Sequence, residues 1–253
     1  MKALLSLPPA VLRKIESSLA FISVVRDLGG TAYADYLVTD DKGFAPYGFI
    51  VFDTEVLQRK ANEWATWKES SPFVNETGSK LTATIEESAN DDRVHAIQYV
   101  LLHEIGHVIS FSLEEFPWAK DDKQTVAKRL STGFPAESWS IANGRVASRF
   151  DAQLPWRGDI HYYSAPEHQK PMALARQAYA DLPNTDFPTL YATTNFNDDF
   201  ADSFASYVHT ELQQKPWEIR IETPGEEPLI YKTCWQEERC RKKRLILESI
   251  LGL

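Results

Sequence analysis

His103-Glu104-Ile105-Gly106-His107 is the stretch that decides the fold, and it lies inside an apolar run from Val100 to Ile109. If this run is helical, His103 and His107 lie one turn apart on the same face. Two imidazoles so placed bind a single Zn²⁺, at about 2.0–2.1 Å for each Zn–N bond. Glu104 follows the first imidazole directly, so its carboxylate reaches a water molecule at the metal without binding the metal itself. The spacing H-E-x-x-H therefore predicts the site of a zinc hydrolase, with Glu104 as the general base.

The sequence on both sides of the motif favours the helix that the motif requires. A strand is predicted over 80–86, and Asn90-Asp91-Asp92 then supplies an N-cap and an acidic first turn. Apolar residues recur at helical spacing up to Phe116-Pro117, which predicts a helix over 91–113. The alternative without a function is a buried helix whose two imidazoles face the core.

Composition limits the kind of partner. The 253 residues carry 27 basic and 36 acidic side chains, a net charge of −9, which argues against nucleic acid as the main partner. No apolar stretch approaches the roughly 20 residues of a transmembrane helix. The N-terminus shows no clear cleavage site. The location is therefore cytoplasmic if Met1 is the native start, and extracytoplasmic if a leader was removed.

Other elements are predicted from periodicity and from turn residues. A helix is expected from Pro9 to about 28 within an N-terminal helical part (about 1–30), and a strand over 47–53. The other expected helices cover 54–67, 171–181 and 196–214, and helices separated by loops cover the Trp-containing region 117–170. A charged helix over about 230–253 completes a single domain spanning 1–253.

The two cysteines, Cys234 and Cys240, lack the spacing of a zinc site. Two ordinary thiols are the expected state, and a disulfide in an oxidising compartment is the alternative.

A catalytic zinc site needs a third protein ligand. Residue 113, six residues after His107, is Leu, which excludes a third histidine at the metzincin position. Asp198 and Asp202 stand at i and i+4 in a predicted helix, so Asp198 is the expected ligand, and Asp202 is expected to accept the N–H of a liganding imidazole. Helix capping and the helix dipole are the alternative explanation for acids here. His161, His168 and His209 are rival ligands.

At these residues the chain resembles the gluzincin group of zinc peptidases, in which an acidic residue on a downstream helix completes H-E-x-x-H. Asn197-Asp198-x-x-x-Asp202 is similar to the N-E-x-x-x-D element of that group. The wider tract from Tyr191 to Phe204 is closer still to the catalytic domains of the anthrax lethal factor type. The resemblance covers well under a tenth of the chain.

The resemblance implies an α+β, zincin-like fold, mostly helical, with a small mixed sheet beside the H-E-x-x-H helix. It makes His103, His107 and Asp198 the zinc ligands, and Tyr191 the phenol that stabilises the oxyanion. The chain departs from the family in having Asp in place of Glu at 198. It also has a long insertion over 114–180, which is expected to form the far wall of the cleft.

The expected activity is zinc-dependent hydrolysis of a peptide or protein substrate that adds as a strand beside residues 80–86. The shorter Asp198 ligand favours one alternative, a zinc-containing binding or regulatory module with little turnover. A second alternative is an interaction protein that acts through the basic run over 239–244. The sequence does not determine the oligomeric state.

Overall fold

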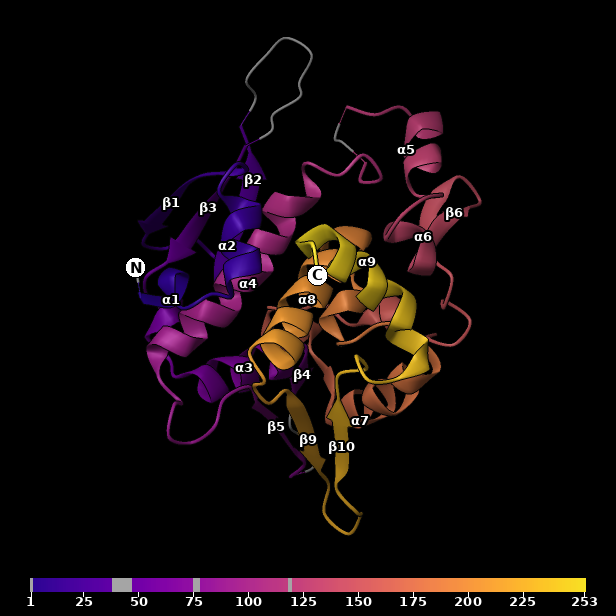
Figure 1. Ribbon diagram of the computed structural model, residues 1–253. Helices are drawn as coiled ribbons and strands as arrows, with labels where there is room; N and C mark the ends of the chain where they lie inside the picture. The colour runs from indigo at the N-terminus through magenta and orange to yellow at the C-terminus, as the bar shows by residue number, and fades with distance from the viewer. Residues whose placement is uncertain (1, 38–46, 75–77, 118–119) are drawn as a thin grey trace.

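A computed structural model describes residues 2–37, 47–74, 78–117 and 120–253, and its elements gather around the central helix α4 (Arg93–Ser110) (Figure 1). The side chain of Asp92 accepts a hydrogen bond from the backbone N–H of His95 and caps the helix start. Twelve of the eighteen residues of α4 are buried, because the helix packs against a sheet on one side and helices on others. The predicted helix is thus confirmed, with ends two to three residues inside the expected bounds.

A small mixed sheet lies beside α4, in the order β1-β3-β2. Its strands are β1 (Leu19–Val25), β2 (Ala32–Tyr36) and β3 (Gly48–Asp53). β3 pairs in parallel with β1 and antiparallel with β2, and both β2 and β3 contact α4. The strand predicted over 47–53 is confirmed as β3, and the chain has the expected α+β class.

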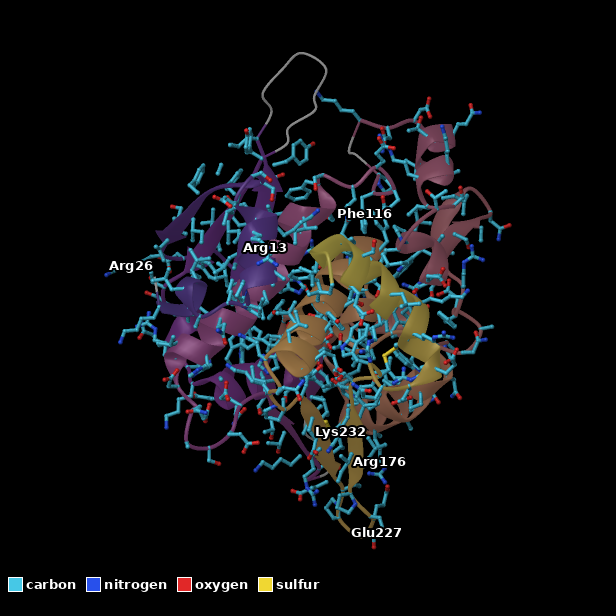
Figure 2. The ribbon with its side chains drawn as sticks, viewed as in Figure 1. Arg13, Arg26, Phe116, Arg176, Glu227 and Lys232 are labelled. Carbon is cyan, nitrogen blue, oxygen red and sulfur yellow. A yellow bond between two sulfur atoms is a disulfide. The ribbon has the colours of Figure 1, made fainter. Side chains whose placement is uncertain are left out.

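The second sheet is antiparallel, in the order β10-β9-β5, and lies at the lower end of the view in Figure 1. Its strands are β5 (Lys80–Thr84), β9 (Glu218–Glu222) and β10 (Leu229–Lys232). Arg176 of α7 (Met172–Asp181) donates to the carbonyl of Glu227 in the turn between β9 and β10 (Figure 2). The strand predicted over 80–86 and the helix over 171–181 are confirmed, but β5 belongs to this sheet and not to the sheet beside α4.

Helix α8 (Phe196–Tyr207) crosses α4 and continues into a π-helical turn, Val208–Leu212. The side chain of Asn195 caps it by accepting from the N–H groups of Asn197 and Asp198. Where the helices cross, a Cβ on Gly106 would lie 2.7 Å from Cα of Ala201. The backbones therefore approach so closely that only glycine fits at 106, and this contact brings the histidines of α4 next to the acids of α8.

The N-terminal part is not the helical segment that the sequence predicted. Helices α1 (Lys2–Leu5) and α2 (Pro9–Ile15) are short, and the predicted helix over 9–28 gives way to β1 from Leu19. The apolar and β-branched run over 19–25 favours a strand, and pairing with β3 decides the outcome over local helical periodicity.

The C-terminal helix also begins later than predicted. Residues 229–232 form β10, and α9 (Arg241–Leu251) starts only after a loop closed by a disulfide between Cys234 and Cys240. Both cysteines are fully buried. The expectation of two free thiols is therefore wrong.

The basic run over 239–244 is exposed only at Arg241 and Lys242. Lys243 is 1% exposed, and its ammonium group lies 2.7 Å from Oδ1 of Asp199. Arg239 donates to the carbonyl oxygens of three residues of one loop: Leu182, Thr185 and Phe187. These contacts hold α9 and the 3₁₀ turn before it, Glu238–Cys240, against the body of the protein, which weakens the interpretation of the run as an interaction site.

The region over 117–170 contains a hairpin that the sequence analysis missed. Helices α5 (Lys123–Arg129) and α6 (Pro135–Ser138) precede the hairpin of β6 (Trp139–Ala142) and β7 (Arg145–Ser148). Asn143 and Gly144 both have positive φ, the backbone that a tight hairpin turn requires, and Asn-Gly is the sequence signal for it. Trp118 lies outside the described residues.

Two further segments complete the fold. Helix α3 (Ala61–Ser70) follows a short 3₁₀ turn, Val56–Gln58, so the helix predicted over 54–67 starts later and ends later than expected. Strands β4 (Phe73–Val74) and β8 (Lys170–Pro171) pair in parallel. In the described part of the chain, no helix combines the length and the apolar character needed to span a membrane.

A buried histidine at the end of α8 predicts acid sensitivity. Nε2 of His209 lies 2.7 Å from the carbonyl oxygen of Ile85 and 3.1 Å from that of Pro216, while its Nδ1 is buried without a hydrogen-bond partner. Burial lowers the pKa of His209 from 6.5 to about 4. Between pH 6.5 and about pH 4 the unfolded chain therefore binds more protons than the folded chain. The free energy of unfolding decreases as the pH is lowered, by about 2 kcal/mol from pH 8 to pH 5.

This contribution is measured as the free energy of unfolding in urea at pH 8 and pH 5. His209→Gln keeps an amide donor towards the two carbonyls and does not titrate, so its loss of stability over the same range is expected to be smaller by that amount. Equal losses in the two proteins would show that His209 is not the acid-sensitive group.

Candidate metal centre

Three donor atoms converge where α4 crosses α8. Nε2 of His103 and Nε2 of His107 lie 3.2 Å apart. Oδ1 of Asp198 lies 3.4 Å from the second of these nitrogens and 3.9 Å from the first. The structure thus brings together the three residues that the sequence predicted as ligands, and among the described residues they form the one group of this kind.

These separations suit a tetrahedral metal ion. For bonds of about 2.0–2.1 Å, tetrahedral geometry places neighbouring donor atoms about 3.3 Å apart. The three measured distances, 3.2, 3.4 and 3.9 Å, lie around this value. Two imidazole nitrogens and one carboxylate oxygen are also a ligand set that zinc accepts in catalytic sites, with the fourth position left open. The residues present therefore fit a zinc ion.

The carboxylate of Asp198 is oriented by the loop before α8. Its Oδ2 accepts hydrogen bonds from Oγ1 of Thr194, at 2.9 Å, and from Nδ2 of Asn195, at 2.6 Å. Although burial opposes it, contact with His107 lowers the pKa of Asp198 below its ordinary value. Oδ2 is therefore held by the two side chains of the loop, and Oδ1 is directed at the imidazoles of His103 and His107.

Asp202, one turn along α8, sets the orientation of His103. Its Oδ1 lies 3.0 Å from Nδ1 of His103, and its Oδ2 accepts a hydrogen bond from the hydroxyl of Thr189. Despite complete burial, the charge of Lys68 and the hydrogen bond with His103 hold the pKa of Asp202 well below its usual range. An ionised carboxylate here accepts a hydrogen bond from Nδ1–H of His103, which leaves the lone pair on Nε2 facing the other donor atoms.

Glu104 faces the same space but is not one of the three donors. It is 5% exposed, and its Oε2 is buried without a hydrogen-bond partner among the described residues. Burial raises the pKa of Glu104, while His103 and His107 act in the opposite direction. A buried carboxylate oxygen without a described hydrogen-bond partner, next to the three donor atoms, is in a position to accept a proton.

Tyr191 lies against the ring of His103, with the ring centroids 5.5 Å apart. It belongs to a 3₁₀ turn, Tyr191–Thr193, just before the cap of α8. Burial and the charge of Asp198 raise the pKa of Tyr191 well above its usual value, so the phenol keeps its proton. The structure places Tyr191 beside the predicted ligands, as the sequence resemblance implied.

Two cavities have the predicted catalytic residues in their walls. A cavity of about 200 Å³ lies between β2, α3 and α4, and a more open one of about 390 Å³ follows β2. Both are lined by Ala32, His103, Glu104 and Tyr191. The rim strand is therefore β2, an edge of the mixed sheet, and the expectation that residues 80–86 form the rim is wrong. Tyr163 lines the smaller cavity, so the 114–180 region does supply part of its wall.

Lys68 of α3 is a residue of the site that sequence reasoning missed. It lines the smaller cavity, is 5% exposed, and its Nζ lies 3.5 Å from Oδ1 of Asp202. A lysine in an amphipathic helix is normally at the surface, so the sequence predicts an exposed side chain here. The only sequence signal for a buried lysine was the acidic neighbour Glu69, which can pair with it.

The rival histidines lie elsewhere. His209 is enclosed by the carbonyls that it contacts, and His161 and His168 are exposed. None of these three histidines belongs to the group formed by His103, His107 and Asp198.

Comparison of the chain with family models, with curated proteins and with solved structures finds no match in any of the three. The site must therefore be interpreted from its own chemistry.

Proposed function

We propose that this chain is a zinc metallopeptidase of the zincin class, with the gluzincin arrangement of ligands. The observation that carries the proposal is the convergence of His103 Nε2, His107 Nε2 and Asp198 Oδ1 beside the buried carboxylate of Glu104. A mixed sheet next to the H-E-x-x-H helix, with one edge strand along the site, supports the zincin-like assignment.

A zinc ion held by these donors would supply Lewis acidity and a nucleophilic water at neutral pH. Glu104 takes a proton from the attacking water and delivers it to the leaving amine. Its burial favours this exchange, because a raised pKa brings the carboxylate closer to the pH at which it works. Tyr191 keeps its phenolic proton and donates it as a hydrogen bond to the oxygen that gains charge.

An extended peptide or protein segment is the substrate that the site accommodates best. Residues 32–35 of β2 line the open cleft, and among the described strands β2 pairs only with β3. In the described part of the chain no strand covers its other edge, and a strand of substrate that added there would run past Glu104. The net charge of −9 argues against a nucleic acid in the same place.

The alternative, a zinc-binding module with little turnover, depends on Asp198, which is shorter by one methylene than the usual Glu. The close crossing at Gly106 and Ala201 compensates, because it moves α8 towards α4 and brings Oδ1 of Asp198 within 3.4 Å of His107. This geometry favours a competent site over a degenerate one.

Removal of the metal tests the proposal. The purified protein is expected to bind one zinc ion per chain and to cleave members of a mixed peptide library. Treatment with 1,10-phenanthroline is expected to abolish cleavage, and addition of zinc to restore it. Zinc content is measured by atomic absorption, and cleavage by mass spectrometry. One bound zinc with no peptide cleaved would favour the binding module, and absence of zinc binding would contradict both.

A further inference from the structure

A buried polar network extends from the metal centre into α3. The ammonium group of Lys68 lies 3.1 Å from Oε1 of Glu69 and 3.5 Å from Oδ1 of Asp202, the oxygen that contacts His103. The other oxygen of Glu69 accepts hydrogen bonds from the phenols of Tyr162, at 2.9 Å, and Tyr179, at 2.6 Å. Lys68 is thus the one cation between two buried carboxylates in this described network.

The position of Lys68 is defined on every side. Its Nζ lies 4.2 Å from the ring centroid of Tyr191 and 5.6 Å from that of Tyr162, so the two ring faces add to the attraction of the carboxylates. A lysine side chain normally has many rotamers, and these contacts select one. The ammonium group is therefore a fixed charge behind His103.

The carboxylate of Asp202 is held from both ends. Its Oδ2 accepts a hydrogen bond from the hydroxyl of Thr189, and its Oδ1 lies 3.5 Å from the ammonium group of Lys68 and 3.0 Å from Nδ1 of His103. Without the ammonium group, no other described contact would hold that oxygen opposite the imidazole, and the imidazole would lose its fixed orientation. Glu69 has two phenol donors of its own, whereas the carboxylate of Asp202 is contacted by His103, Lys68 and Thr189.

We propose that Lys68 is a positioning residue of the metal centre: its fixed ammonium group holds the carboxylate of Asp202 in the place from which it orients His103 towards the metal. The inference rests on the metal site of the proposed function, but not on peptide cleavage. It means that metal affinity also depends on a residue of α3, outside the H-E-x-x-H motif and the carboxylate ligand.

A double-mutant cycle on zinc affinity tests this assignment. The four proteins are wild type, Lys68→Met, Asp202→Asn and the double variant, and the zinc dissociation constant is measured by competition with a chromophoric chelator. Lys68→Met is expected to weaken zinc binding by about 10- to 100-fold, the usual effect of losing a partner behind a ligand. In the Asp202→Asn background, where the carboxylate that Lys68 holds is absent, the same change is expected to alter affinity less than about threefold.

Two controls separate positioning from general stability. Lys215→Met removes another cation paired with a buried carboxylate, Glu86, away from the donor cluster, and is expected to lower stability without changing zinc affinity. If Lys68→Met fails to fold alone, Lys68→Met with Glu69→Gln leaves only Asp202 without its cation, and this variant is compared with Glu69→Gln.

Wild-type zinc affinity in Lys68→Met would overturn the assignment, and so would an equal loss in both backgrounds of the cycle. A protein that binds zinc and shows the expected coupling but cleaves no peptide would contradict the proposed peptidase activity and leave the role of Lys68 standing. Absence of zinc binding in the wild type would overturn both.

Discussion

Replacement of Glu104 by glutamine is expected to lower peptide cleavage by a factor on the order of 10²–10⁴, the usual contribution of a general base. Glutamine has nearly the same size and shape but cannot accept the proton from the attacking water. Zinc affinity is expected to change less than about threefold, because the three donor atoms belong to other residues. The measurements are the initial rate of cleavage of a library peptide and the zinc dissociation constant.

An exposed glutamate on the loop before α4 provides the matched control, since Glu87→Gln makes the same chemical change outside the two cavities that line the site. Its cleavage rate is expected to equal that of the wild type. Cleavage by Glu104→Gln at the wild-type rate, with zinc fully bound, would show that the base is another group. A large loss of zinc in the same variant would instead make Glu104 part of the metal binding.

Local pattern was sufficient for the part of the site that lies on one helix. The spacing of His103 and His107, the apolar stripe and the cap at Asp92 are all properties of consecutive residues, and the structure has α4 as they predict. Asp198 and Asp202 could be predicted from the sequence for a similar reason, because they share one face of a second helix. Their distance from the histidines could not be predicted, since it depends on how the two helices cross.

Tertiary contacts decided what the sequence analysis missed. Residues 19–25 have a helical pattern that pairing with β3 overrides, and the buried positions of Lys68 and Lys243 exist only because carboxylates from distant segments surround them. The disulfide between Cys234 and Cys240 likewise depends on a loop that no short pattern specifies. One signal was present inside the motif itself. A glycine in the middle of a buried helix costs stability, so Gly106 pointed to a close backbone approach.

That approach makes Gly106→Val a strong test of how the site is assembled. A Cβ at this position would lie 2.7 Å from Cα of Ala201, 3.1 Å from its carbonyl oxygen and 3.3 Å from its Cβ, so α8 must move away from α4. Such overpacking is expected to lower the free energy of unfolding by about 3 kcal/mol. Zinc affinity is expected to fall at least about tenfold, because Asp198 moves with α8. Its side chain is too short to reach the metal from the shifted position. Urea denaturation of the metal-free protein and chelator competition measure the two effects.

The nearest atoms to the new side chain belong largely to the backbone of residue 201, which makes the test specific. Removing the methyl group by Ala201→Gly is therefore not expected to restore zinc affinity in the Gly106→Val background. Gly158→Ala is the control, because a Cβ at 158 meets no atom within 4 Å, and both quantities should stay at wild-type values. If Gly106→Val is destabilised but binds zinc as tightly as the wild type, then the crossing of α4 and α8 does not set the reach of Asp198, and another residue must provide the third donor.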